Sequence, residues 1–171
     1  DEGRFELYSQ PIIALTGGQH REELLLRMIG RGGEEILPGS FLPAAEKYGL
    51  IFEIDQWVVT EAVRLAAAGR NVQINVSAAS ISSVDLLPVI ERELRATGAD
   101  AANLVFEITE TALMLDLAAG EAFASRLAQL GCGVALDDFG TGFGSFTYLK
   151  RLRVHYLKID IEFIRDLPTS L

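Results

Sequence analysis

Two adjacent acidic residues, Asp137 and Asp138, end a short apolar run that begins at Val134, and glycines follow at positions 140, 142 and 144. A short apolar run bounded by turn residues is typical of a buried strand, and glycines permit backbone angles that other residues avoid. We therefore expect two carboxylates at the C-terminal end of a strand, beside a loop that is able to move. Paired acids repel each other, so their proximity suggests a divalent cation that prefers oxygen ligands. The alternative is a solvated turn, in which Asp and Gly are common.

Further polar residues recur on the same face of other predicted strands. The set comprises Glu23, Asn75, Glu107, Asp137, Asp138 and Lys158, with Arg27 nearby. Four carboxylates and an amide oxygen suit one or two hard divalent cations, and two such ions can clamp a phosphodiester and generate hydroxide for in-line attack. In that chemistry Lys158 would position the water or neutralise the phosphate, and Arg27 would hold a nonbridging phosphate oxygen. The alternative is a set of buried ion pairs among Lys158, Arg27 and the acids.

Other chemistries fit the sequence less well. A Schiff-base lysine needs a lowered pKa, whereas the acids expected around Lys158 would raise it. A serine hydrolase would need a Gly-x-Ser-x-Gly motif, which is absent, and the two histidines, His20 and His155, are not placed to serve it. Cys132 lies beside a buried strand and is expected in the core rather than as a nucleophile. The glycine loop matches neither the dinucleotide fingerprint nor the Walker motif.

The elements that must position these residues alternate along the chain. Strands are predicted at residues 5–13, 20–29, 72–77, 103–109, 133–137 and 154–160, and helices at about 40–48, 54–68, 85–97, 117–130 and 145–151. Asp116 is a predicted N-cap, and glycines at 69, 98 and 131 are predicted to stop helices that each feed a new strand. Strands that alternate with helices indicate a parallel α/β sheet.

The two faces of the predicted strands differ in character. One face is apolar and is expected to pack against helices through Ile74, Val76, Leu104, Phe106, Ile108, Val134, Leu136, Leu157 and Ile159. The other face carries the polar set, expected near the C-terminal ends of the strands. An open, doubly wound sheet has helices on both faces, so one polar face favours a TIM-like (β/α) barrel. Six of its eight barrel strands are present in this chain, and the pattern leaves open an antiparallel first strand.

The composition describes a globular protein with one domain over residues 1–171. About half of the 171 residues are apolar and 23% are charged. The net charge of −9 argues against binding to a nucleic acid polymer. No apolar run reaches the length of a membrane span, so we expect no direct membrane insertion. A single cysteine, with no signal-peptide character at the N-terminus, favours the cytoplasm, although the domain could belong to a membrane-anchored protein.

Motifs throughout the chain resemble those of the EAL-domain family of cyclic di-GMP phosphodiesterases. They are Glu23-Leu-Leu-Leu-Arg27, Pro38-Gly-Ser-Phe-Leu-Pro43-Ala-Ala-Glu46, Ile54-Asp55-Gln-Trp57, Asn75-Val-Ser77, Glu107-Ile-Thr-Glu110, Asp137-Asp-Phe-Gly-Thr-Gly142 and Lys158-Ile-Asp160. Leu24 stands where the family signature has alanine. Any one of these motifs would be weak evidence, but the series together is specific.

The resemblance implies a role for each matching residue. Glu23, Asn75, Glu107 and Asp137 would bind the first of two Mg²⁺ or Mn²⁺ ions, and Asp138 would contribute to the second. Lys158, Glu23 and Asp137 would be catalytic, with Lys158 on the attacking water. Gln10, Arg27 and Asp160 would contact the substrate. Glu110 would tether the glycine loop 138–145, which in the family also couples to dimerisation.

The resemblance also implies the reaction and the partners. Cyclic di-GMP would be hydrolysed to linear pGpG in bacterial second-messenger signalling, by a homodimer fused to a sensory or GGDEF-type domain. The family pattern continues past Leu171 with two strands that carry a further metal-binding glutamate and a glutamine, so we expect the domain to be C-terminally incomplete here. The alternative function is a noncatalytic cyclic di-GMP receptor, inactive through loss of those strands.

Overall fold

A computed structural model of the chain describes residues 3–18, 20–140 and 146–165. The strands are β1 (Phe5–Ile12), β2 (Arg21–Ile29), β3 (Glu35–Ile36), β4 (Val72–Asn75), β5 (Leu104–Thr109), β6 (Gly133–Phe139) and β7 (Tyr156–Ile159). The α-helices are α1 (Pro38–Lys47), α2 (Ile51–Ala67), α3 (Ala78–Ser82), α4 (Leu86–Thr97), α5 (Glu110–Leu115) and α6 (Leu117–Leu130). Three short 3₁₀ helices are η1 (Ala101–Asn103), η2 (Phe146–Lys150) and η3 (Ile161–Phe163).

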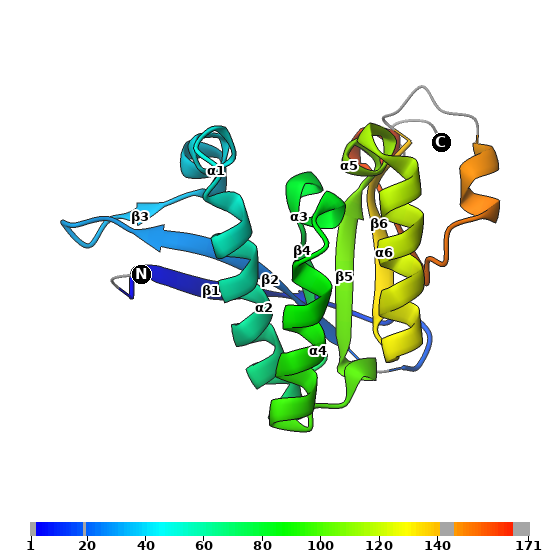
Figure 1. The fold of residues 1–171 in the computed structure, drawn as a ribbon, viewed down its shortest axis with the longest axis horizontal. Helices are drawn as coiled ribbons and strands as arrows, with labels where there is room; N and C mark the ends of the chain where they lie inside the picture. The colour runs from blue at the N-terminus through cyan, green and yellow to red at the C-terminus, as the bar shows by residue number, and fades with distance from the viewer. Residues whose placement is uncertain (1–2, 19, 141–145, 166–171) are drawn as a thin grey trace.

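The strands form one sheet in the order β1-β2-β4-β5-β6-β7, with β3 paired to β2. Strand β1 is antiparallel to β2, and the pairs from β2–β4 to β6–β7 are parallel. Helices α2, α4 and α6 lie side by side over one face of this sheet (Figure 1). The predicted α/β fold is therefore confirmed, with its six strands arranged as a partial (β/α) barrel and the first strand antiparallel.

Local sequence signals explain where the long helices begin and end. Asp116 caps α6, because its Oδ1 accepts a hydrogen bond from the Ala119 amide at 3.0 Å. Gly98 and Gly131 end α4 and α6 in the left-handed region, with φ of 67° and 90°. These predictions are confirmed, while the first two helices begin earlier than predicted, at Pro38 and Ile51. The predicted helix at 145–151 is the shorter 3₁₀ helix η2.

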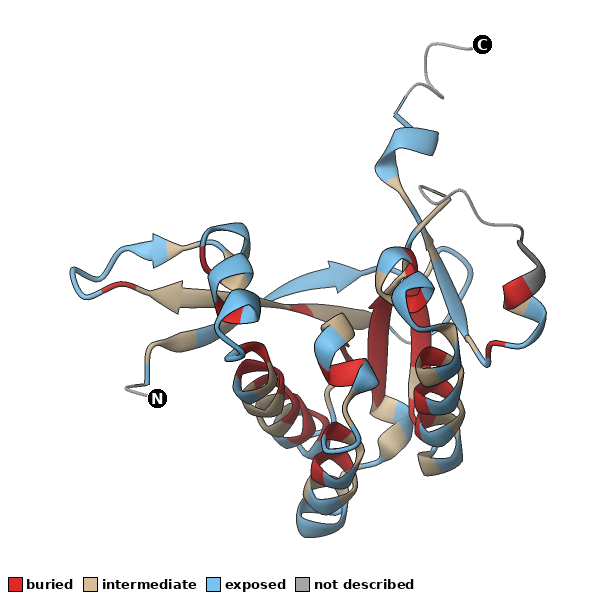
Figure 2. Ribbon diagram, turned by 45° about the horizontal axis from the view of Figure 1, so that its top comes forward, coloured by how far each residue is buried: buried red, intermediate tan, exposed pale blue. Residues whose placement is uncertain are grey.

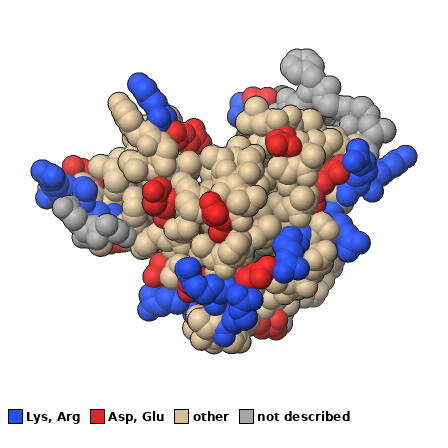
Figure 3. Space-filling model, in the orientation of Figure 1, with Lys and Arg blue, Asp and Glu red and all other residues tan. Residues whose placement is uncertain are grey.

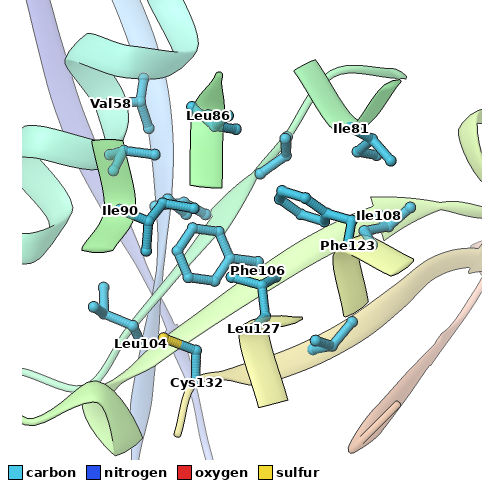
Figure 4. Packing of buried hydrophobic residues seen from close by; sticks show 14 of the residues in the cluster. Val58, Ile81, Leu86, Ile90, Leu104, Phe106, Ile108, Phe123, Leu127 and Cys132 are labelled. Carbon is cyan, nitrogen blue, oxygen red and sulfur yellow. The ribbon is translucent and has the colours of Figure 1, made fainter. Parts of the chain in front are cut away.

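The core lies between the sheet and the helices. Figure 4 shows Phe106 and Leu104 of β5 packed among Ile90 of α4, Leu127 of α6 and Cys132. Burial raises the pKa of the Cys132 thiol to about 12, which fits the predicted place in the core rather than a nucleophile. The helix-facing strand residues of β4, β5 and β6 are buried, as predicted. Alternation along each strand therefore identified the packed face correctly.

The prediction of helix packing is wrong for the last strand. Leu157 and Ile159 of β7 are 46% and 60% exposed. Strand β7 lies at an edge of the sheet and contacts β6, and in the described part of the chain only the short helix η3 comes after it. Figure 2 shows this strand as exposed, beside the buried strands β5 and β6. An apolar strand face needs a covering element to be buried, and alternation alone does not supply one.

Several short elements were not predicted. They are the two-residue strand β3 and the helices α3 and α5, of five and six residues. Such lengths are too short to show a hydrophobic period. The signal that was present is a capping residue after a strand: Ser77 and Thr109 each accept a hydrogen bond from an amide three residues later.

The surface carries charges of both signs. On the face shown in Figure 3, basic and acidic side chains lie beside one another. The ion pairs of Arg126 and Arg95 with Glu91 are examples of this mixing. In the described residues, no helix is long and apolar enough to span a membrane.

Candidate active site

The ammonium group of Lys158 lies among three carboxylates on the face of the sheet opposite the helices. Its Nζ donates hydrogen bonds to Glu23 Oε2 at 3.1 Å and to Asp137 Oδ2 at 3.2 Å, and it also donates to Glu107 Oε2. Asn75, the last residue of β4, donates from Nδ2 to Glu23 Oε1 at 3.1 Å. The structure thus brings together five predicted residues from five strands.

Glu23 does not lie where the sequence placed it along its strand. It is the third residue of the nine-residue strand β2, not a residue near the C-terminal end. The reason is that β2 pairs with β4 only over Glu22–Leu24, while its last residues, Met28 and Ile29, pair with β3. The C-terminal half of β2 therefore extends past the end of β4, and Glu23, which is paired with Gln73, contacts Asn75 through its side chain.

The charges of the cluster favour a protonated Lys158. Burial opposes its positive charge, but the hydrogen bond to Glu107 and the charges of Glu107, Glu23 and Asp137 raise the pKa of Lys158 above its usual range. Burial also raises the pKa of Glu107, whose side chain is 0% exposed, and Lys158 partly offsets that effect. An ammonium held in this way is a poor Schiff-base nucleophile, as the sequence indicated.

A β-bulge places the two adjacent acids opposite Lys158. Leu136 pairs with Leu157 and Phe139 with Ile159, so Asp137 and Asp138 together oppose the single residue between those partners. Asp138 has a φ of 52°, in the left-handed region that Asp tolerates better than most residues. Burial raises the pKa of Asp138, and the negative charges of Asp137 and Asp160 raise it further. The three carboxylates are therefore close enough to interact, at the same edge of the sheet.

Glu110 connects the end of β6 to helix η2. Its Oε2 accepts a hydrogen bond from the Gly140 amide at 2.9 Å, and its Oε1 accepts one from the Tyr148 hydroxyl at 2.6 Å. These contacts hold both ends of the glycine-containing segment. Residues 141–145 of the predicted loop 138–145, including two of its three glycines, lie outside the described residues.

The three residues predicted to contact substrate surround the cluster without joining it. Arg27 donates from Nε to Glu35 Oε1 at 2.7 Å, and its guanidinium lies 5.4 Å from the ring centre of Tyr8. Gln10 is paired with Glu23 across β1 and β2. Asp160 follows β7 and caps η3. The alternative in which Arg27 forms ion pairs with the clustered acids is not what the structure has, because Glu35 of β3 is its partner.

Comparison with known protein families decides the relationship of this chain. The sequence profile of the EAL domain matches residues 1–170. The chain belongs to the EAL domain family. It is 35% identical, over 99% of its length, to the cyclic di-GMP phosphodiesterase PdeF of Escherichia coli (strain K12), and 36% identical, also over 99%, to the cyclic di-GMP phosphodiesterase NbdA of Pseudomonas aeruginosa. In each case it spans 23% of the length of the relative.

Solved EAL structures share this fold. The EAL domain of FimX from Pseudomonas aeruginosa bound to c-di-GMP superposes with a TM-score of 0.94 at 34% identity, over 98% of this chain and 70% of that one. The PaMucR phosphodiesterase in complex with c-di-GMP has a TM-score of 0.89 at 36% identity, over 99% of this chain and 72% of that one. Both structures hold the same cyclic dinucleotide.

The donor set of this EAL domain fits a hard divalent cation by type. The residues on the site face offer carboxylate and amide oxygens, which Mg²⁺ and Mn²⁺ prefer. As the side chains stand, Lys158 occupies the space between the carboxylates, and no group of three His, Cys, Asp or Glu side chains in the described residues is arranged to hold a metal ion. Binding of a metal between the acids therefore requires Lys158 to withdraw from at least some of them.

Two further residues of the EAL site were missed from the sequence. Gln73 is 3% exposed and donates a hydrogen bond to Glu107 Oε1. Alternation along β4 puts Gln73 on the same face as Asn75, so the signal was available. Tyr148, which supports Glu110, carried no comparable signal because it follows a glycine-rich stretch of sequence and does not lie in a predicted strand.

The contacts of Glu110 lead to a first prediction. Glu110→Ala removes the acceptor for the Gly140 amide, so we expect amide hydrogen exchange at Gly140 to accelerate by about tenfold or more, the effect of losing a charged hydrogen bond. Glu110→Gln can still accept from Gly140 and donate to the Tyr148 oxygen, and should exchange close to wild type. Tyr148→Phe leaves the Gly140 bond in place and serves as the control. Equal exchange in Glu110→Ala and wild type would remove Glu110 as the tether.

Proposed function

We propose that this EAL domain is a metal-dependent phosphodiesterase that hydrolyses cyclic di-GMP to linear pGpG. The observation that carries the proposal is the convergence of Glu23, Glu107 and Asp137 on the Lys158 ammonium, with Asn75 hydrogen-bonded to Glu23. Relatives named cyclic di-GMP phosphodiesterases, and EAL structures that contain c-di-GMP, support the choice of substrate.

In the proposed site, Glu23, Asn75, Glu107 and Asp137 would hold a first Mg²⁺ or Mn²⁺ ion, and Asp138 would contribute to a second. When bound, two such ions supply a hydroxide nucleophile at neutral pH and neutralise charge on the phosphodiester. Lys158 lies beside these residues, so its side chain would be placed to donate a hydrogen bond to the attacking water or to a phosphate oxygen. Gln73 and the buried surroundings of Glu107 restrict water around the Glu107 carboxylate.

Arg27, Gln10 and Asp160 are proposed to bind the cyclic dinucleotide. Arg27 is pre-positioned by Glu35 and Tyr8, and a guanidinium can donate two parallel hydrogen bonds to a phosphate. Arg27→Lys loses this fork and the stacking on Tyr8. We expect its Kd for cyclic di-GMP, measured by calorimetry in EDTA, where no hydrolysis is expected, to rise by roughly tenfold, on the scale of one lost charged hydrogen bond. Arg126→Lys, on the helical surface beside Glu91, should bind like wild type.

The experiment that tests the function is product analysis. The protein is incubated with cyclic di-GMP and MgCl₂ or MnCl₂, and the nucleotides are separated by chromatography. We expect pGpG to accumulate with either metal and to be abolished by EDTA. Absence of pGpG with both metals, in a sample that still binds cyclic di-GMP, would overturn the proposal.

That second outcome corresponds to the alternative function, a noncatalytic cyclic di-GMP receptor domain. The observation that favours it is the set of ion pairs from Lys158, which satisfies the carboxylates without a metal. A receptor would bind cyclic di-GMP with the same affinity in EDTA and in MgCl₂. The phosphodiesterase would instead show product formation only with metal.

The wider context is also a proposal. One relative of similar identity, MucR of Pseudomonas aeruginosa, is a bifunctional diguanylate cyclase and cyclic di-GMP phosphodiesterase, and this chain spans 24% of it. We infer that the EAL domain acts next to a fused sensory or GGDEF-type domain, as a homodimer in the cytoplasm. Glu110 would then link the active-site edge, through Gly140, to the segment that takes part in dimerisation.

A further inference from the structure

The motif Ile54-Asp55-Gln56-Trp57 has no part in the chemistry proposed above, yet it contains a buried acid. Asp55 lies on α2 and is only 7% exposed. Burying a carboxylate is costly unless hydrogen bonds compensate for the lost water. Burial accordingly raises the pKa of Asp55, and the hydrogen bonds of Ser77 act in the opposite direction. The partners of this carboxylate therefore indicate what it does.

Two hydrogen bonds join the Asp55 carboxylate to Ser77, two residues beyond the end of β4. Its Oδ2 accepts from the Ser77 amide at 3.1 Å and from the Ser77 hydroxyl at 2.5 Å. The same Ser77 oxygen accepts a hydrogen bond from the Ser80 amide at 3.2 Å and so caps α3. One carboxylate on a long, buried helix thus fixes both the backbone and the side chain of Ser77.

Ser77 is two residues after Asn75, and the residue between them is held from the other side. The Val76 amide donates to the Glu107 carbonyl at 3.0 Å. The turn Asn75–Ser77 is therefore clamped between β5 and α2, immediately beyond the point where Asn75 contacts Glu23. A shift of this turn would move the Asn75 side chain relative to the acids.

We propose that Asp55 is a positioning residue, which fixes the Asn75 side chain in the site by holding Ser77. Its relevance to catalysis rests on the proposed function, in which Asn75 is a metal ligand. Removing a residue that supports a metal ligand typically weakens metal affinity by roughly 10–100-fold. Asp55 would act in this way although it touches neither the acids nor the substrate.

The positioning itself can be tested without metal or substrate. Asp55→Ala should accelerate amide hydrogen exchange at Ser77 by about tenfold or more, because the amide loses a charged acceptor. Val63→Ala is the matched control: Val63 is buried on the same helix, two turns further on, so its loss lowers stability without touching Ser77. If Ser77 exchanges equally fast in wild type and Asp55→Ala, Asp55 does not hold this turn and the proposal is wrong.

The link to Asn75 can be tested by the affinity for Mn²⁺, measured by calorimetry on the apoprotein. Asp55→Ala should weaken Mn²⁺ binding by about tenfold. In an Asn75→Ala background the same substitution should have little further effect, since the ligand through which it acts is already gone. An equal loss in both backgrounds would overturn the proposal.

A simple capping role predicts a different order of variants. Ser77→Ala removes the cap of α3 and the hydroxyl contact but keeps the backbone contact with Asp55. We therefore expect its Mn²⁺ affinity to lie between those of wild type and Asp55→Ala; a loss as large as that of Asp55→Ala would show that capping is the whole effect and overturn the proposal. If wild type binds no Mn²⁺, the proposed function is wrong, while the exchange rate at Ser77 still decides whether Asp55 holds the turn.

Discussion

Glu23→Gln should lower the turnover of cyclic di-GMP by at least about two orders of magnitude, the scale of losing one key electrostatic group. The substitution preserves the shape of the side chain, and its amide oxygen can still accept from Asn75 Nδ2. What it removes is a negative charge from the proposed hard-cation site. Lys158 keeps Glu107 and Asp137 as partners, so the fold should survive. Initial rates of pGpG release at saturating MgCl₂ give the measurement.

The neighbouring residue on the same strand offers a matched control. Glu22→Gln removes the same charge one position earlier, where the side chain is paired with Arg70. Because Glu22 points away from Lys158 by the alternation of β2, its turnover should remain near wild type. Near-wild-type hydrolysis by Glu23→Gln would exclude Glu23 from the mechanism, and an equal loss in both variants would indicate a general effect of charge.

The sequence was informative about which residues share a face. Alternation in β4, β5 and β6 put Asn75, Glu107 and Asp137 opposite the buried residues, and the structure brings all three to Lys158 or to its partner Glu23. Helix boundaries marked by a capping residue, such as Asp116 and Gly131, were predicted equally well from the sequence. Both signals are local: each depends on residues within a few positions of each other along the chain.

Features that depend on a partner strand could not be predicted from the sequence. The bulge that places both Asp137 and Asp138 opposite Lys158 depends on how β6 pairs with β7. The alternation of apolar and polar residues in β6 does not show that an extra residue is present there. The position of Glu23 depends on how far β2 runs past β4. The contact of Asp55 with Ser77 joins a helix to the turn after β4, 22 residues away.

Lys158→Ala is expected to lower turnover by on the order of 10²-fold or more, as for loss of a group that serves the attacking water. The structure predicts the opposite effect on metal affinity, which should rise. Because the ammonium now neutralises Glu23, Glu107 and Asp137, it competes with a divalent cation for the same oxygens. Its removal should tighten Mn²⁺ binding by roughly tenfold, a change of about 1.4 kcal/mol in binding free energy. Turnover and metal affinity should therefore change in opposite directions.

This pair of measurements separates the possible roles of Lys158. A lysine that only held the acids in place would, on removal, weaken metal binding and lower turnover together. A Schiff-base lysine would yield a borohydride-reduced adduct at position 158, and trapping one would contradict the role proposed here. Lys150→Ala, on the exposed side of η2, removes a positive charge outside the cluster and should change neither quantity. Weaker Mn²⁺ binding in Lys158→Ala would show that the ammonium organises the carboxylates and does not compete with the metal for them.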